Sequence, residues 1–341
     1  MRKFRKITII FVFMLTLAAV SAFSLDLSEI QKTADNFATS MAKSLPFNST
    51  MGLNWSDAHI GQLIAMPPHF GLGATLGFTT MDYDSIIALL DLFEISLPEK
   101  LNWKGFPLPG YTVDARIGGI ILPFDIGVKF GTLNIKEGFW NALKLEDIDF
   151  TMNYMLVGAD IRYKIVGKKK SPFKLSIGAG FNYLKGGISL PVRTDDPLEL
   201  SFGSHTLKLP GSTISLNWNT KSMDFKAQAS VKVAVLTPYV GLGASHAWSS
   251  AGYGLTTNEN IQVDGADIDL ENETIINALK NYGLTNIAEK NIEQSNTVKG
   301  WSLRAYGGFS INVSFFRFDF TGMYDILSKN YGVTFGIRFQ I

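Results

Sequence analysis

The stretch Tyr331–Ile341 reads YGVTFGIRFQI and alternates without a break between large apolar side chains and small or polar ones. Successive side chains of a β-strand point to opposite faces, so this stretch predicts a strand with one apolar and one polar face. Such a strand, roughly 9–11 residues long, suits a transmembrane β-barrel, whose outside meets lipid and whose inside is polar. The alternative is an edge strand of a soluble β-sandwich.

The first residues predict secretion. A basic head, Met1–Lys6, precedes an apolar run from Ile7 to Val20, and Ala22 and Ser24 offer cleavage positions. This order is typical of a signal peptide, so we expect residues 1–24 to be removed. The alternative is a retained anchor helix, which normally needs about 20 apolar residues.

Composition fits a strand-rich membrane protein and narrows its partners. The chain has 32 Gly, 12% aromatic and 18% charged residues, and its formal net charge is +1. A charge so close to neutral argues against a nucleic-acid partner. The sequence contains no Cys, which excludes disulfides and thiolate metal sites.

Residues 25–68 differ from the rest of the chain. Apolar residues recur at steps of three and four from Leu25 to Leu45, which predicts a helix ended by Pro46. The pattern from Phe47 to Pro68 is irregular. We expect this segment at the periplasmic mouth, either folded into the lumen as a plug or lying beside the barrel.

Alternating stretches recur through residues 69–341. They predict an all-β fold, a transmembrane antiparallel up-and-down β-barrel of about twelve strands, with roughly ten to fourteen possible. Two stretches, Leu198–Leu209 and Thr213–Asn219, are weak, and if both are loop the count is ten. The other predicted strands are centred on residues 70–78, 111–117, 126–130, 155–165, 173–183, 223–235, 240–244, 301–311, 316–320 and 331–341.

The lengths of the connections give an orientation. Outer-membrane barrels have short periplasmic turns and longer outer loops, and both ends of the barrel lie in the periplasm. The predicted periplasmic turns are Ile120–Phe124, Val166–Pro172, Leu209–Ser212, Leu236–Pro238 and Asn312–Phe315. The predicted outer connections are Met81–Gly110, Thr132–Phe150, Leu184–Pro197, Asn219–Ser222, Ser249–Lys299 and Asp325–Asn330.

The strand register predicts a charged lumen. Its basic lining is Arg116, Lys129, Arg162, Lys164, Lys174, Lys226, Lys232, Arg304, Arg317 and Arg338. The predicted inward acids are Asp114, Asp125, Asp160, Asp224 and Asp319. The basic surplus suits an anionic or carboxylate-bearing ligand. The alternative is a network of ion pairs that fills a narrow lumen.

Two outer loops contain predicted helices. The apolar helix Ile86–Ile95, closed by Pro98, must bury its side chains, and Ile86, Leu89, Leu90 and Phe93 are candidate contacts for a hydrophobic ligand. The alternative is permanent packing against the barrel rim or lipid. In the second loop, Asn272–Tyr282 resembles a capped amphipathic helix, and the alternative is a solvated loop.

Catalytic signals are weak. None of His59, His69, His205 and His246 has a Ser or acidic residue at a spacing that suggests a dyad or triad. No glycine-rich phosphate loop appears. We therefore expect no enzyme, no cofactor and no metal site.

The signal peptide, the plug-like segment, the apolar first outer loop and the alternating C-terminal strand together resemble the long-chain fatty-acid transporter (FadL-like) family of outer-membrane barrels. The ending also resembles the C-terminal signal that the barrel assembly machinery reads. The Asn-Pro-Ala tripeptide of that family's hatch does not occur here, so no binding residue is carried over.

The expected location is therefore the bacterial outer membrane, with membrane lipid and the assembly machinery as partners. The resemblance implies passive uptake or passage of small hydrophobic or amphipathic molecules. The alternative function is a surface-exposed structural or adhesin barrel with a blocked lumen.

Overall fold

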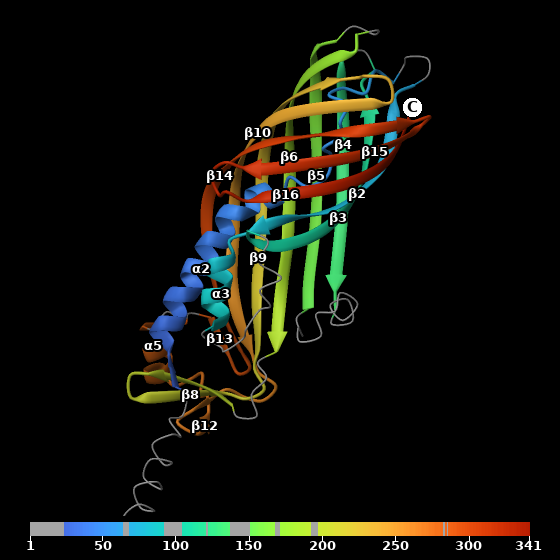
Figure 1. Ribbon diagram of the computed structural model, residues 1–341. Coiled ribbons are helices and arrows are strands. Elements are labelled where there is room, and N and C mark those ends of the chain that lie inside the picture. The colour runs from blue at the N-terminus through green and yellow to red at the C-terminus, as the bar shows by residue number, and fades with distance from the viewer. Residues whose placement is uncertain are drawn as a thin grey trace, which may run out of the picture.

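The computed structural model describes residues 24–63, 68–91, 104–120, 122–136, 151–167, 171–191, 197–281, 284 and 286–341. In this part of the chain, ten strands form an antiparallel barrel, which closes because β16 pairs with β2 and β10 pairs with β14 (Figure 1). The barrel strands are β2 (Phe70–Met81), β3 (Phe106–Gly118), β4 (Phe124–Ile135), β5 (Thr151–Val166), β6 (Phe173–Pro191), β9 (Thr213–Val231), β10 (Leu236–Thr256), β14 (Asn291–Val313), β15 (Phe316–Asp325) and β16 (Tyr331–Gln340).

The favoured count of twelve strands is wrong by two, and the alternative count of ten is confirmed. The stretch Leu198–Leu209 forms a hairpin outside the barrel, made of β7 (Leu198–Phe202) and β8 (His205–Leu209). The stretch Thr213–Asn219 is the first part of β9, which continues through the predicted outer connection Asn219–Ser222. The predicted connection is wrong because it rests on the polarity of Thr220 and Ser222. Both residues are buried on the inner face of the strand. An even count is kept.

As predicted, short connections lie at one end of the barrel and long ones at the other. Some of the predicted connections have different bounds or lie at the other end. One end, here called the short-turn end, carries the turns at residues 119–123, 167–172, 232–235 and 314–315. The other, the long-loop end, carries residues 82–105, 136–150, 192–212, 257–290 and 326–330. The predicted periplasmic turn Leu209–Ser212 therefore lies at the long-loop end. Several loops are shorter than predicted because β6, β10 and β14 continue further than their strongest alternation.

The barrel wall is uneven in height. β14 has 23 residues and β10 has 21, whereas β15 and β16 have 10 each. Since a membrane-spanning strand needs roughly 9–11 residues, the long strands extend beyond the bilayer at the long-loop end. The wall is lowest where β15 and β16 lie.

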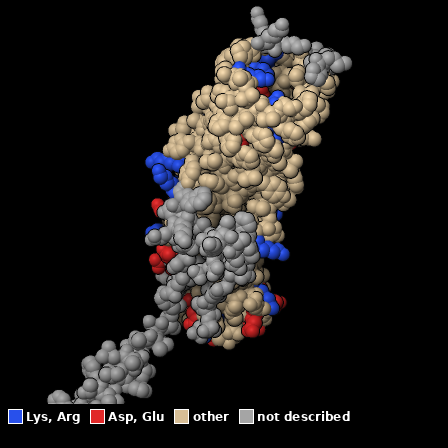
Figure 2. Space-filling view, turned by 45° about the vertical axis from the view of Figure 1, so that its right-hand side comes forward, with Lys and Arg blue, Asp and Glu red and all other residues tan. Residues whose placement is uncertain are grey.

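The outer surface of the barrel is apolar. Side chains on the outward positions are large and exposed, and Leu242 is 63% exposed. Figure 2 shows a broad band over the strands with few charged side chains, and charges gathered towards the two ends. A soluble protein rarely leaves so large an apolar surface in water, so this band faces lipid. Among the described residues, no helix is both long and apolar enough to cross a bilayer.

The N-terminal segment enters the barrel from the long-loop end. Helix α2 (Leu27–Asn48) packs inside that end against β10 and β14, and residues 49–60 continue through the interior towards the short-turn end (Figure 1). The prediction that the whole segment sits at the periplasmic mouth is therefore wrong for α2. The helix also extends past Pro46, which lies in its last turn.

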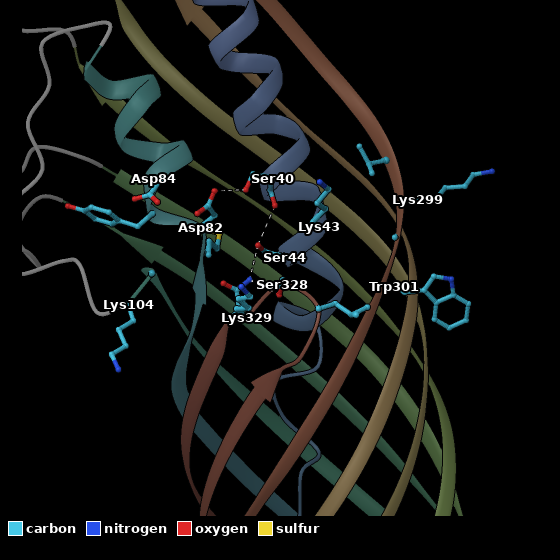
Figure 3. A pocket seen from close by; sticks show the side chains of 17 residues that line it. Ser40, Lys43, Ser44, Asp82, Asp84, Lys104, Lys299, Trp301, Ser328 and Lys329 are labelled. Atoms are coloured by element: carbon cyan, nitrogen blue, oxygen red, sulfur yellow. Dashed lines mark hydrogen bonds between the residues drawn. The ribbon is translucent and has the colours of Figure 1, made fainter.

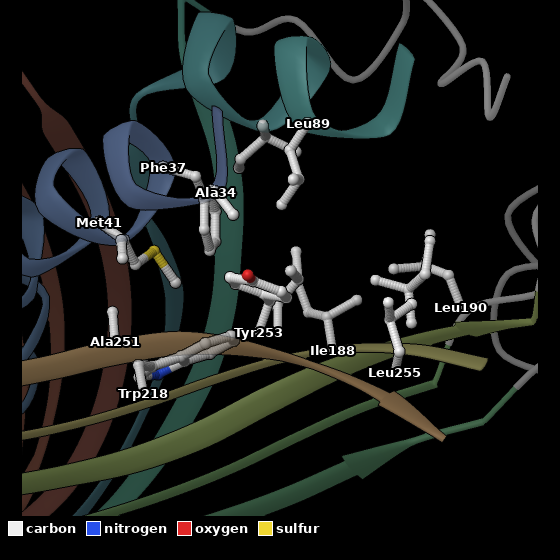
Figure 4. Close-up of a cluster of buried hydrophobic side chains, with 14 of the residues drawn as sticks. Ala34, Phe37, Met41, Leu89, Ile188, Leu190, Trp218, Ala251, Tyr253 and Leu255 are labelled. Atoms are coloured by element: carbon white, nitrogen blue, oxygen red, sulfur yellow. The ribbon is translucent and has the colours of Figure 1, made fainter. Parts of the chain in front are cut away.

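Apolar packing explains the position of α2. Its side chains Phe37 and Met41 belong to one hydrophobic cluster with Trp218 and Tyr253 of the barrel wall (Figure 4). Trp218 and Tyr253 lie in the parts of β9 and β10 that are near the long-loop end. Helix α3 (Tyr83–Asp91) completes the cluster with Leu89.

The long-loop end carries a small cap. A five-stranded sheet joins β7 and β8 to β1 (Ser24–Asp26), β11 (Gln262–Val263) and β12 (Ala266–Asp267). Helix α5 (Glu273–Asn281) confirms the second predicted loop helix. Asn272 caps its N-terminus, since its Oδ1 accepts from the backbone N–H of Thr274. Strand β13 (Asn286–Ala288) pairs with β14. Because β1 pairs with β7, residue 24 lies at the long-loop end.

A charge in the outer band should weaken assembly. We predict that Leu242→Arg lowers the free energy of unfolding in lipid by about 2–4 kcal/mol, because Leu242 lies near the middle of the apolar band. Urea unfolding in lipid vesicles, followed by heat-modifiable gel mobility, measures this. Leu270→Arg in the cap is the control, and its effect should stay within about 0.5 kcal/mol. Equal effects of both variants would contradict a lipid-facing band.

Candidate functional site

A network of ion pairs crosses the barrel interior between β3, β4, β5 and β9. The Arg116 guanidinium lies 2.6 Å from Asp125 and 2.7 Å from Asp160. Arg162 also binds Asp125, at 2.8 Å, and Lys226 binds Asp160 at 2.5 Å. Buried charges are stable only when paired and hydrogen-bonded, and here each carboxylate has two cationic partners.

Glycine makes room for this network. Gly127 is directly opposite Arg116 in the β3–β4 register. A Cβ at Gly127 would lie 2.7 Å from Arg116 Nη2, which is too close for two non-bonded atoms. The glycine therefore lets the guanidinium lie flat against the neighbouring strand.

Two further arginines bind carboxylates elsewhere in the lumen. Arg304 Nη1 lies 2.6 Å from Asp224 Oδ1 and also donates to Ser245 Oγ. Arg338 Nε lies 2.7 Å from Asp319, and its Nη2 lies 3.0 Å from Asp57. The pair between Arg338 and Asp57 is important because Asp57 belongs to the segment inside the lumen.

Barrel side chains hold the backbone of residues 49–60. Lys129 Nζ donates to the carbonyls of Ser49 (2.9 Å) and Met51 (2.5 Å). Gln228 Nε2 donates to the carbonyl of Trp55 at 2.7 Å, and Lys174 Nζ to that of His59 at 2.8 Å. Further hydrogen bonds join the segment to side chains of β3, β4, β5, β9, β10, β14, β15 and β16, namely Asp114, Asp125, Arg162, Ser222, Ser230, Tyr239, Ser310, Asp319 and Arg338.

Trp55 lies at the centre of this arrangement and is 3% exposed. Its indole Nε1 donates to Asp114 Oδ1 at 2.8 Å. The guanidinium carbons of Arg338 and Arg116 lie 4.6 Å and 5.6 Å from its ring. The ring thus joins the two arginine clusters through cation–π contacts.

The predicted lumen lining divides into two groups. Deep inside the barrel lie Arg116, Lys129, Arg162, Lys226, Arg304 and Arg338. Lys164 and Lys174 are half-buried near the short-turn end, and Arg317 there donates to the carbonyls of Ser314 and Phe316. Lys232 is exposed and follows the end of β9, so it does not line the lumen. The deep cations bind carboxylates or backbone carbonyls, an arrangement that favours the alternative of an ion-pair network.

The predicted ligand-contact residues lie against α2. Ile86, Leu89 and Leu90 of α3 are each at most 3% exposed and belong to the same hydrophobic cluster as Phe37 (Figure 4). This burial favours permanent packing over a free binding surface. Phe93 and the rest of the predicted helix lie outside the described residues.

The histidines are dispersed. His246 lies on the outer wall with its ring centroid 4.8 Å from that of Trp248. His205 Nδ1 lies 2.6 Å from Asp264 Oδ2, a pairing across 59 positions that spacing did not predict. This hydrogen bond lowers the pKa of Asp264, and both side chains are exposed in the cap. Within the described ranges, no cluster of three or more His, Asp or Glu is arranged to hold a metal ion.

Sequence reasoning missed Trp55 and Asp57, which connect the segment to both arginine clusters. A signal existed, since a single Trp stands directly between polar residues, with Asn54 before it and Ser56 and Asp57 after it. It also missed Gln228 as a donor to the segment, because an inward Gln has no feature that distinguishes it from an ordinary wall residue.

A closed antiparallel barrel with an apolar outer band and a polar, ion-paired interior is an outer-membrane β-barrel, and this chain is a protein of that class. Within the class, a family model matches residues 123–341. The chain therefore belongs to that family, which is described as a family of unknown function (DUF6588).

Comparison with other proteins gives distant likenesses. No curated protein matches the chain. Among solved structures, the outer-membrane protease OmpT from Escherichia coli is 10% identical, with 84% of this chain and 100% of that one covered and a TM-score of 0.42. The translocator domain of the autotransporter NalP from Neisseria meningitidis is 12% identical (89% and 99% covered, TM-score 0.37). The toluene transporter TbuX from Ralstonia pickettii is 11% identical (80% and 88% covered, TM-score 0.27).

The ion pairs of the lumen should carry stability. We predict that Arg338→Ala lowers the free energy of unfolding by about 3–5 kcal/mol, because it leaves Asp57 and Asp319 buried without a cation. Arg317→Ala, at the exposed rim, is the matched control and should cost about 1 kcal/mol or less. Urea titration of both variants in lipid tests this. Similar losses would show that the Arg338 contacts are not formed.

Proposed function

We propose that this protein is a surface-exposed outer-membrane barrel whose lumen is closed by its own N-terminal segment, residues 25–60. The observation that carries the proposal is the set of hydrogen bonds between residues 49–60 and the inward side chains of the barrel strands. A segment that merely passed through a wide pore would hydrogen-bond to water instead.

The size of the barrel supports closure. The interior of a barrel of roughly eight strands is just filled by its own side chains. Ten strands enclose only slightly more space, and the segment occupies it with Trp55, Ser56 and Ala58, each at most 3% exposed. The guanidinium groups of Arg116 and Arg338 take up the space beside the indole.

The long-loop end is the part available for contacts. Long connections lie outside the cell in outer-membrane barrels, which would place the cap and α5 at the cell surface. The strands β6, β9, β10 and β14 extend beyond the apolar band and support this cap. A structural or adhesive role for the exposed end follows from this arrangement.

Uptake of small hydrophobic or amphipathic molecules is the second candidate. The resemblance to the FadL-like family favours it, as does a pocket in the low part of the wall. Passage through the lumen requires residues 49–60 to move, and each lost hydrogen bond costs about 0.5–1.5 kcal/mol, or more where charged groups take part. A lateral route is therefore the form of uptake that the geometry favours.

Conductance separates a closed barrel from an open one. We predict that the purified wild-type protein gives no single-channel steps in a planar bilayer. Replacing residues 49–60 with a Gly/Ser linker should open a water-filled path and produce steps. A variant with Gly/Ser at residues 269–272, in the exposed cap, is the control and should stay silent.

Heat-modifiable gel mobility shows whether the linker variant has folded before its conductance is measured. Regular single-channel steps from the wild-type protein would contradict the proposal, whatever the variant does. A folded linker variant that remains silent would contradict closure by residues 49–60, because α2 or another part of the protein would then block the lumen.

A further inference from the structure

A pocket of about 640 Å³ opens through the side of the barrel where the wall is low. Its lining comes from α2, from the junction of β2 and α3, from the long-loop half of β14, and from the loop between β15 and β16 (Figure 3). β15 ends at Asp325 and β16 begins at Tyr331, whereas β14 continues to Asn291. The short strands therefore leave one side of α2 uncovered by the wall.

The lining is basic. It contains four lysines, Lys43, Lys104, Lys299 and Lys329, against two carboxylates, Asp82 and Asp84. All four lysines are exposed, and in the described part of the chain none forms an ion pair. Asp82 is already bound, since it accepts hydrogen bonds from Ser40 (2.7 Å) and from the hydroxyl of Ser85.

Polar hydrogen-bonding groups lie between the lysines. Ser40, Ser44 and Ser328 line the pocket, and Asn330 Nδ2 donates to Ser44 Oγ at 2.8 Å. In Figure 3, Lys43 and Lys329 lie near the middle of the view, with Lys104 and Lys299 on opposite sides. The hydroxyls of Ser40, Ser44 and Ser328 already donate to other groups of the protein. The ammonium groups of Lys43 and Lys329 therefore remain as the central donors for an anion with several acceptor oxygens, such as a phosphate.

The pocket lies at the edge of the apolar band. Trp301, 55% exposed on the outer wall, belongs to its lining, and Lys299 is the next outward residue of β14 towards the long-loop end. Exposed apolar side chains continue beside the mouth at Leu327 and Leu303. Outer-membrane barrels carry aromatic girdles at the membrane interfaces, so the lysines stand at the depth of the lipid head groups.

We propose that this pocket binds the phosphate-bearing head group of an anionic lipid from the adjacent leaflet. Lys43 and Lys329 bind the phosphate oxygens, and the acyl chains lie on the apolar wall below, against Leu303 and Leu327. A membrane lipid matches both the basic pocket and the apolar surface beside its mouth. A free anion would contact the basic pocket alone. The site is independent of lumen closure, which conductance measures separately.

The test uses the full-length protein in bilayers of phosphatidylcholine containing a small fraction of spin-labelled phosphatidic acid. The spectrum reports how strongly phosphatidic acid is selected over phosphatidylcholine at the protein surface. We expect clear selectivity for the wild type and a loss of roughly thirtyfold in the double variant Lys43→Gln/Lys329→Gln, since each lysine near the surface contributes about 1 kcal/mol.

The control is Lys221→Gln/Lys280→Gln, which removes two exposed lysines of the same half of the molecule that do not line the pocket. It should keep the wild-type selectivity. An equal loss in both double variants would overturn the site in favour of general surface charge. Wild-type selectivity that is absent, or abolished by millimolar inorganic phosphate, would overturn the lipid assignment, the latter in favour of a free anion.

Discussion

Every polar group of a chain segment buried inside a barrel must find a partner, because the interior offers little water to replace one. The structure meets this constraint at several backbone carbonyls of the segment with inward lysine, arginine and glutamine side chains. Lys129 and Lys174 bind carbonyls near the two ends of residues 49–60, and Gln228 binds one between them. In an open pore, the charged groups of the lumen would contact solutes. Here they bind other groups of the protein itself.

The threaded segment determines other parts of the architecture. Because residues 49–60 run between the two ends of the barrel, α2 has to lie at the long-loop end, where Trp218 and Tyr253 cover its apolar side. Support for α2 explains why β9, β10 and β14 are long. On the opposite side, β15 and β16 stop early, and the pocket beside α2 results from that difference.

The sequence predicted the barrel well, because period-two alternation depends only on neighbouring residues and on lipid outside. It also placed Arg116, Arg162 and Arg338 inside, since register fixes the face of each side chain. It failed at residues 219–222, where polar residues on the inner face of β9 resemble a turn. Polar residues on the inner face of a strand make its sequence hard to distinguish from that of a loop.

The threading itself could not be predicted, because it depends on partners far apart in the chain. Trp55 and Asp114 are 59 residues apart, and Asp57 and Arg338 are 281 apart. The pairing of lysines with backbone carbonyls leaves no trace in the sequence. The same reason explains why the sequence left a ligand site and an ion-pair network as alternatives for the basic lining, whose deep charges pair within the protein.

One measurement tests the threading most directly. The chain has no Cys, and the hydroxyl oxygens of Ser49 and Ser222 are 2.8 Å apart in the lumen. Ser49→Cys/Ser222→Cys should form a disulfide nearly completely on mild oxidation of the folded protein, while the mismatched pair Ser49→Cys/Ser310→Cys should not. Two free thiols in the first variant, or equal cross-linking of both pairs, would contradict a fixed segment inside the barrel.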